Sequence, residues 1–402
     1  MVKKKYPDYR WYILTLVAMT SIFVMSMPFI SMSVLFDEIS DDLGLSLVQV
    51  GIVWGIFPFG SIFFSLIGGM LGDRFGTKIV ISVTCLIAGL AGASRGLSGD
   101  FITLTATMFL FGLPIAVLPT AVTKAVGIWF PGHSLTLAQS ILSISMALGF
   151  TLGTLFSATV FSPLLGSWRY IIFIYGAISI AISFLWFLTR SNPGTVESSA
   201  NNLNRVSFRQ AISHVYHLKS VWILMIILLG HASCIQGVLG YLPLYLRDIG
   251  WTAARADGTA ASFHVASLIA TMPVALLSNK LASRKLVIYA ALLMTATGIM
   301  LLSVVSGPMI WLSVILAGMF RDGFMAVYMT TLIETDGIGT TYAGTALGLI
   351  LTFARSAEIV SPPIGNSLAN IALNLPFLFW GCLAVVALVA SYFVKETAKR
   401  QA

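Results

Sequence analysis

Long apolar windows recur along this chain and restrict it to one kind of fold. A helix needs about 20 apolar residues to cross roughly 30 Å of hydrocarbon, and each window is about that long. Lipid offers the backbone no hydrogen-bond partner, so each window is expected to be helical. The sequence therefore predicts an all-α membrane protein with twelve transmembrane helices, in the windows Trp11–Leu35, Val48–Leu71, Ile79–Leu97, Phe101–Ile128, Leu135–Phe161, Tyr170–Leu188, Val221–Leu246, Thr259–Leu277, Leu286–Val305, Met309–Ile333, Ala343–Ile371 and Leu375–Val394.

The composition excludes a soluble fold. Hydrophobic residues make up 57% of the chain and charged residues 9%, whereas a soluble domain carries about 25% charged residues. The first window follows a basic segment, as a signal peptide would, but it is too long and no small-residue cleavage site follows it, so we expect a retained helix. The three cysteines lie inside windows, where a thiol behaves as a small hydrophobe, and neither a disulfide, a metal site nor a cofactor is expected.

The distribution of lysine and arginine predicts the orientation. Sixteen of these residues fall in the terminal tails, the central loop and the loops after the second and eighth windows. Cytoplasmic loops carry an excess of positive charge, so both termini are predicted to be cytoplasmic. The same asymmetry accounts for the net charge of +8, and no nucleic-acid partner is needed to explain it. Only four fall on the opposite side, namely Arg95, Arg169, Arg247 and Arg255.

A weak internal repeat divides the chain into halves. Residues 70–81, MLGDRFGTKIVI, align without gaps on residues 276–287, LLSNKLASRKLV, 206 positions later. Repeated six-helix halves related by an axis along the membrane normal occur in one large class of secondary transporters. We therefore predict two pseudo-symmetric six-helix bundles, residues 1–189 and 220–402, joined by a cytoplasmic linker at 190–219.

Two polar segments have open interpretations. Residues 207–217, SFRQAISHVYH, could form a short helix along the cytoplasmic surface or remain a plain linker. The segment after the first window carries four acidic residues and no basic one, and we expect a solvated extracytoplasmic loop in preference to a cation-collecting mouth; the four are Asp37, Glu38, Asp41 and Asp42.

Five charged residues lie inside predicted spans, where each costs at least about 2.5–3.5 kcal/mol on insertion scales. Arg355 and Glu358 are three positions apart and could pair on one helix face. Arg321 and Asp322 are consecutive, so their side chains point about 100° apart around the helix and one of the two needs a partner elsewhere. Arg355 could be that partner for Asp322. With Lys124 the set has three positive and two negative charges, which favours an anionic guest. The alternative is a structural salt-bridge cluster that holds two helices together.

Buried ion pairs contribute little net stability, so these charges suit switching better than adhesion. Glu358 or Asp322 could carry a coupling proton if its surroundings raise its affinity for one. Further polar groups inside spans are candidates for the binding site, namely His231 and Gln236 in the seventh window and His264 in the eighth. In the eleventh window, Pro362-Pro363 is expected to break or kink the helix.

The loop between the second and third windows carries the pattern Gly69-x-x-x-Asp73-Arg74-x-Gly76-x-Lys78. With twelve spans and a repeat of six, the chain resembles the major facilitator superfamily over essentially its whole length. The resemblance implies that these five loop residues gate the two halves. The chain also resembles the branches that carry small anions: Arg355 fits the helix 11 cation of the oxalate and monocarboxylate members, while helix 8 offers His264 in place of an arginine.

The sequence thus predicts a non-enzymatic, proton-coupled transporter of a small organic anion in the cell (inner) membrane, which acts by alternating access and is expected to be a monomer. Arg321, Arg355, Lys124, His264, His231 and Gln236 are the predicted binding residues. An exporter of amphipathic drug-like compounds and a transporter-like membrane sensor remain the alternatives.

Overall fold

The computed structural model describes residues 9–131, 134–190, 208–281 and 283–397. Every regular element among them is a helix, and the chain divides into two compact units. The first unit covers 1–45 and 56–200, and the second covers 46–55 and 201–402. Residues 46–55 therefore group with the second unit although they precede most of the first in sequence.

The first helical run of unit 1 is longer than its apolar window. α1 (Tyr9–Met19), the π-helical turn η1 (Thr20–Ser26) and α2 (Met27–Leu43) follow one another, and Gly44 ends the run in the left-handed conformation at φ 62°. The acidic residues at 37–42 thus lie in the last turns of α2, and the prediction that they form a loop was wrong. Hydropathy marks where lipid ends, whereas the helix continues until glycine stops it.

The remaining helices of unit 1 are only weakly amphipathic, as expected for helices that face lipid on one side and neighbouring helices on the other. The bounds are α4 (Phe59–Phe75), α5 (Thr77–Ser94), η2 (Arg95–Leu97), α6 (Phe101–Trp129), α7 (Ser134–Phe156), η3 (Ser157–Phe161), α8 (Ser162–Leu165) and α9 (Trp168–Leu188).

α6 begins with a capping box. The Thr103 backbone N–H donates to the Asp100 carboxylate, and this hydrogen bond holds the pKa of Asp100 below its ordinary value.

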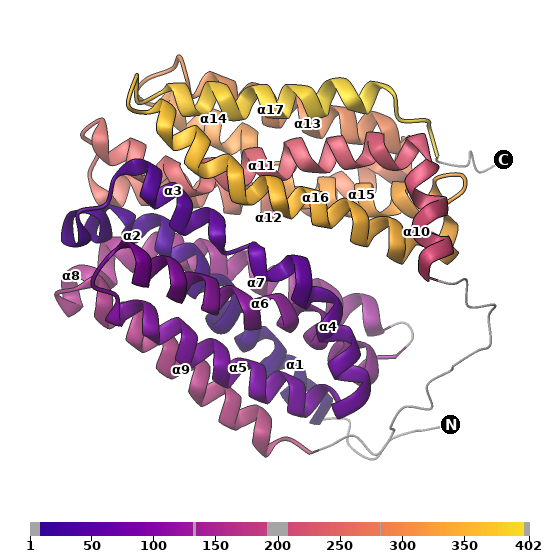
Figure 1. Cartoon of the computed structure of the whole chain (residues 1–402), viewed down its shortest axis with the longest axis horizontal. Coiled ribbons are helices and arrows are strands. Elements are labelled where there is room, and N and C mark those ends of the chain that lie inside the picture. The colour runs from indigo at the N-terminus through magenta and orange to yellow at the C-terminus, as the bar shows by residue number, and fades with distance from the viewer. Residues whose placement is uncertain (1–8, 132–133, 191–207, 282, 398–402) are drawn as a thin grey trace. The chain divides into compact units, whose positions relative to one another are not determined.

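Unit 2 is built around α11, which packs against both α16 and α17, as Figure 1 shows. Its helices are α10 (Phe208–His217), α11 (Lys219–Asp248), α12 (Ala253–Lys280), α13 (Arg284–Leu301), α14 (Met309–Gly318), α15 (Arg321–Glu334), α16 (Gly339–Leu368) and α17 (Leu375–Tyr392). α3 (Leu47–Ile56) adds its residues up to Gly55 to this unit.

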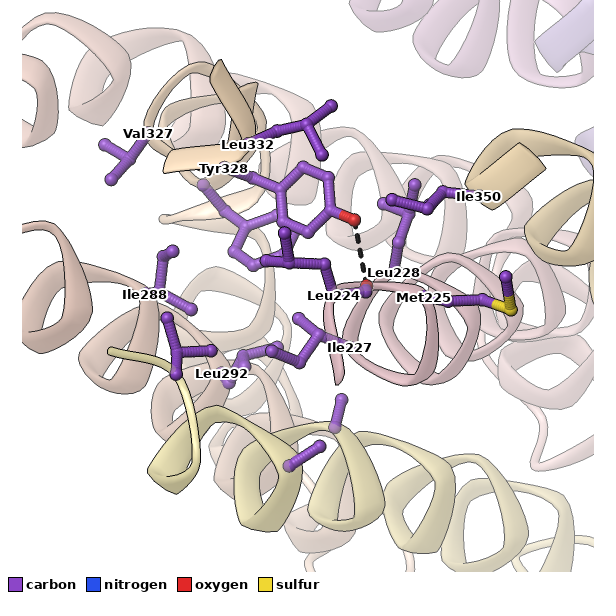
Figure 2. Close-up of a cluster of buried hydrophobic side chains, with 14 of the residues drawn as sticks. Leu224, Met225, Ile227, Leu228, Ile288, Leu292, Val327, Tyr328, Leu332 and Ile350 are labelled. Atoms are coloured by element: carbon purple, nitrogen blue, oxygen red, sulfur yellow. Dashed lines mark hydrogen bonds between the residues drawn. The ribbon is translucent and has the colours of Figure 1, made fainter. Parts of the chain in front are cut away.

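Aliphatic side chains from α10, α11, α12, α13, α15, α16 and α17 fill a common core, part of which Figure 2 shows. Leu224, Ile227 and Leu228 of α11 meet Ile288 and Leu292 of α13, all at most 3% exposed. Tyr328 of α15 lies in the same core and donates its hydroxyl to the Leu224 carbonyl at 2.8 Å, so its one polar atom is satisfied (Figure 2). This core fixes α15 against α11 within two helical turns of Arg321 and Asp322.

Eleven helical runs in the described part of the chain are long and apolar enough to cross a membrane. α12 is 28 residues long and is not among these eleven runs. Twelve spans and cytoplasmic termini therefore stay predictions. Most of the predicted linker, 191–207, lies outside the described residues, and Phe208–His217 forms a helix.

α16 does not break at its two prolines. It runs from Gly339 to Leu368 through Pro362 and Pro363, so the helix does not break there, and the alternative of a kink stays a prediction. Because proline has no N–H, the carbonyls of Glu358 and Ile359 lose their helical donors. Gly55 of α3 packs directly on the Ile359 carbonyl, which a side chain at that position would overlap.

Candidate functional site

Arg321 and Asp322 lie where a membrane span is interrupted. α14 ends at Gly318 and α15 begins at Arg321, 12 residues into the 26-residue span Met309–Glu334. At 1.5 Å per residue this is about 18 Å from the start of the span, near its middle. Transporters use such half-helix N-termini to hold anionic groups, because the helix dipole and unpaired N–H groups favour negative charge.

His264 of α12 is a hydrogen-bond partner of Arg321. Its Nδ1 atom lies 3.2 Å from Arg321 Nη1. The two helices approach closely at this level because Gly318 of α14 packs on the backbone of Phe263, where any side chain would overlap. The guanidinium also lies 6.0 Å from the ring of Phe263. Glycine and an aromatic ring thus place the histidine beside the arginine.

Asp322 is held by Ser267, one turn further along α12. The Ser267 hydroxyl donates to Asp322 Oδ2 at 2.7 Å and accepts from the Asp322 backbone N–H at 3.2 Å. Arg321 Nε lies 3.6 Å from Asp322 Oδ1, a loose ion pair in which the side chains are 22% and 40% exposed. We call His264, Ser267, Arg321 and Asp322 the α12–α15 cluster.

α11 contributes polar groups next to α15 and α16. The ring of His231 lies 4.1 Å from that of Phe324, two residues after Asp322 on α15. On the other side, Ser361 of α16 donates to the Ser233 carbonyl at 2.9 Å. His231 Nδ1, Ser233 Oγ and Gln236 Nε2 are buried and have no hydrogen-bond partner in the described part of the chain. Such atoms require water or a guest molecule.

Arg355 and Glu358 form the second charged group. Arg355 Nη1 donates to Glu358 Oε2 at 2.6 Å, as the three-residue spacing predicted. The pair is asymmetric, since the arginine side chain is 39% exposed and the glutamate side chain 8%. The suggested pairing of Asp322 with Arg355 does not occur among the described ion pairs; each of the two has a nearer partner.

Lys124 belongs to unit 1 and lies near one end of its helix. It is five residues from the end of α6, and its Nζ lies beside Gly72 of α4, 3.8 Å from where a Cβ of that residue would stand. Gly72 precedes Asp73 in the gating pattern; the side chain of Asp73 is outside the described part. Arg74 is exposed and lies over Phe75, Lys78 lies over Phe187, and Gly76 has a φ of 80° between α4 and α5.

The structure thus brings His264, Arg321 and Asp322 together, pairs Arg355 with Glu358, and leaves Lys124 in the other unit.

The sequence analysis did not identify three groups of polar residues that the structure shows inside the helices. Ser267 has the spacing of a same-face partner of His264, which was a usable signal. Asp257 forms a buried ion pair with Arg247 at 2.7 Å, and Arg95 is fully buried over the ring of Phe111 at 3.9 Å.

These features define a multi-pass membrane transporter: an all-helical chain with long apolar spans and a polar cluster at mid-span. The chain belongs to the Major Facilitator Superfamily, whose sequence profile matches residues 14–362. This confirms the resemblance, and the protein is a transporter and not an enzyme.

Two curated relatives align over most of the chain. The probable sulfoacetate transporter SauU of Cupriavidus necator is 25% identical over 91% of this chain and 89% of its own. The probable galactarate/D-glucarate transporter GarP of Escherichia coli is 24% identical over 92% and 91%. Among solved structures, a D-xylose-proton symporter matches with a TM-score of 0.77 at 17% identity, covering 97% of this chain and 99% of that one, which shows the same fold.

Proposed function

We propose that this protein is a proton-coupled transporter of a small organic anion. The observation that carries the proposal is the position of Arg321: its guanidinium lies at mid-span, at the start of a half-helix, 3.2 Å from His264 Nδ1 and 3.6 Å from Asp322 Oδ1. A guanidinium presents a planar set of donors that matches a carboxylate or sulfonate. The names of the relatives, which are anion transporters, point the same way.

Arg355 is the second proposed anion ligand. Its half-exposed side chain is now occupied by Glu358. An incoming anion would compete with that carboxylate, and protonation of Glu358 would release the arginine. Asp322 is the other carboxylate able to take this role beside Arg321. Anion binding and proton binding are then coupled within unit 2.

Three further polar residues have proposed roles. His264 positions Arg321, and the unsatisfied atoms of His231 and Gln236 supply neutral contacts. Lys124 lies beside the gating pattern, which favours a role with Asp73, Arg74 and Lys78 over direct contact with the anion. Twelve spans in two six-helix halves, cytoplasmic termini, a place in the bacterial inner membrane and a monomeric state complete the proposal.

Uptake into proteoliposomes tests it. Radiolabelled sulfoacetate and D-glucarate are the probes, D-xylose is the neutral comparison, and an inward proton gradient is imposed or omitted. We expect accumulation of one of the two anions, faster with the gradient, and a loss of at least about tenfold in Arg321→Gln and Arg355→Gln, equal to about 1.4 kcal/mol of binding free energy.

The matched control is Arg255→Gln, which removes the same charge from an exposed arginine that lies over Trp251 outside the proposed site. Uptake with unchanged affinity in the Arg321 and Arg355 variants would refute the binding assignment. Gradient-independent uptake would refute proton coupling. Flux of lipophilic cations instead would favour the exporter, and binding without flux the sensor.

A further inference from the structure

The contact between His264 and Arg321 determines which nitrogen of the histidine carries a proton. Arg321 Nη1 lies 3.2 Å from His264 Nδ1. A guanidinium has only N–H donors and no acceptor, so Nδ1 must offer its lone pair. His264 is therefore neutral in this arrangement, with its proton on Nε2. A proton on Nδ1 would set two donors and two positive charges against each other.

We propose that His264 is the anion-linked proton acceptor of this transporter, locked neutral by Arg321 until an anion engages the guanidinium. This inference rests on the proposed function and deepens it, because it adds a proton site distinct from Glu358 and Asp322. When a carboxylate or sulfonate binds Arg321, it replaces the histidine as the partner of Nη1. Nδ1 is then free to take one proton from water, and the anion offsets the added charge. No covalent bond of the anion changes.

The burial of His264 strengthens the coupling between anion binding at Arg321 and protonation of the histidine. His264 is 2% exposed and is packed at the level where Gly318 meets Phe263, so the ring cannot move away from the guanidinium into water. Charges interact more strongly where water is excluded. The same confinement makes binding of the anion and the proton mutually favourable, and such coupling is reciprocal.

The groups around His264 leave few competing proton sites. α15 contributes Arg321 and Asp322, and α11 contributes His231 against Phe324. α14 carries no titratable residue. The charges of α13 are in its first turn, where Arg284 pairs with Glu334 and Lys285 donates to the Tyr392 carbonyl, and on α12 itself Asp257 pairs with Arg247.

Nitrogen-15 NMR of histidine-labelled full-length protein tests the lock without any anion. We expect His264 to carry its proton on Nε2 in the unaltered chain, and the doubly protonated fraction at mildly acidic pH to rise in Arg321→Gln. A proton on Nδ1 in the unaltered chain, or no rise in the variant, would overturn the proposal. Both readouts stand even if the protein transports no anion.

Calorimetric titration with sulfoacetate and D-glucarate, in two buffers of different ionisation heat, counts the protons taken up. We expect about one proton per bound anion, with affinity rising about tenfold per unit fall in pH. His264→Asn keeps an acceptor at the Nδ1 position but cannot be protonated, so it should bind without proton uptake. His217→Asn, on the exposed face of α10, is the matched control and should retain uptake.

Glu358→Gln separates this proposal from the carboxylate alternative. Proton uptake on anion binding that persists in Glu358→Gln and vanishes in His264→Asn supports the proposal that His264 accepts the proton. Proton uptake that vanishes in Glu358→Gln and persists in His264→Asn contradicts this proposal, while the protein can still be an anion transporter. If neither anion binds the unaltered chain, the proposed function fails on these probes, and the NMR result alone decides the histidine lock.

Discussion

At the scale of single residues, the two candidate guanidiniums are held in different ways. Arg355 donates to a buried carboxylate at 2.6 Å, whereas Arg321 faces a histidine nitrogen and a half-exposed carboxylate at 3.6 Å. Arg321 is therefore the easier of the two for an anion to capture, and Arg355 needs Glu358 to be neutralised first.

The asymmetric exposure of the Arg355–Glu358 pair predicts unequal effects of breaking it. Arg355→Gln leaves an ionised carboxylate buried without its partner, and removal of one member of a buried pair costs about 3–5 kcal/mol. Glu358→Gln leaves a half-exposed arginine that water can solvate, so we expect a loss of about 1 kcal/mol or less. Thermal unfolding of the purified protein measures both.

A larger loss of melting temperature in Glu358→Gln than in Arg355→Gln would contradict this reading. The unaltered chain is the reference for both variants.

At the scale of elements, the cluster depends on how closely α12 and α14 approach. Gly318 contacts the backbone of Phe263, and Gly323 of α15 packs on the side chain of Val274, eleven residues further along α12. Backbone atoms cannot rotate away as side chains do, so the first contact is the stricter one. It also lies next to His264.

Gly318→Ala should therefore disturb both stability and the cluster. Its new Cβ would overlap the Phe263 carbonyl and lie 2.8 Å from the Phe263 Cα, so one helix must shift. We expect a loss of about 1–3 kcal/mol, the usual range for overpacking, and weaker anion binding because His264 moves from Arg321. Unfolding and calorimetric titration report the two effects.

Gly344→Ala in α16 is the matched control, because no atom lies within 4 Å of its Cβ position. Replacing glycine by alanine inside a helix stabilises by up to about 1 kcal/mol when nothing clashes. If Gly318→Ala lowered stability no more than Gly344→Ala, the close approach of Gly318 to Phe263 would make no measurable contribution to stability.

At the scale of the whole molecule, structural grouping and sequence order differ. Residues 46–55 pack within unit 2: Trp54 Nε1 donates to the Gln236 carbonyl at 2.7 Å, and the Leu47 carbonyl accepts from Asn366 Nδ2 at 2.8 Å. Trp54 is 1% exposed. α3 is thus hydrogen-bonded to both α11 and α16.

Hybrid chains with GarP of Escherichia coli test this grouping. One hybrid takes the relative's whole first half, and the other keeps residues 46–55 from this chain together with its second half. We expect the second hybrid to melt at a higher temperature, because Gly51 and Gly55 still fit the backbone at Pro363 and Ile359. Equal melting temperatures would mean that the α3 contacts tolerate exchange.

Sequence reasoning reached the features that depend on local spacing. Helical windows follow from the needs of a backbone in lipid, and the Arg355–Glu358 pair follows from three-residue spacing. It could not find the contact of His264 with Arg321, because hydropathy places a helix along the membrane normal but leaves its rotation and neighbours open. Those were set here by Gly318, whose contact partner is 55 positions away in the sequence.

The first helical run of unit 1 extends beyond the lipid. Its 35 residues span about 52 Å, against roughly 30 Å of hydrocarbon. The tip of α2 is held there by Asp42, which pairs with Arg169 of α9 with both side chains about one-third or more exposed. Dissolved salt screens such a wet pair and barely reaches the dry Arg247–Asp257 pair. A rise in salt concentration would thus weaken the Asp42–Arg169 tether and leave the Arg247–Asp257 pair intact.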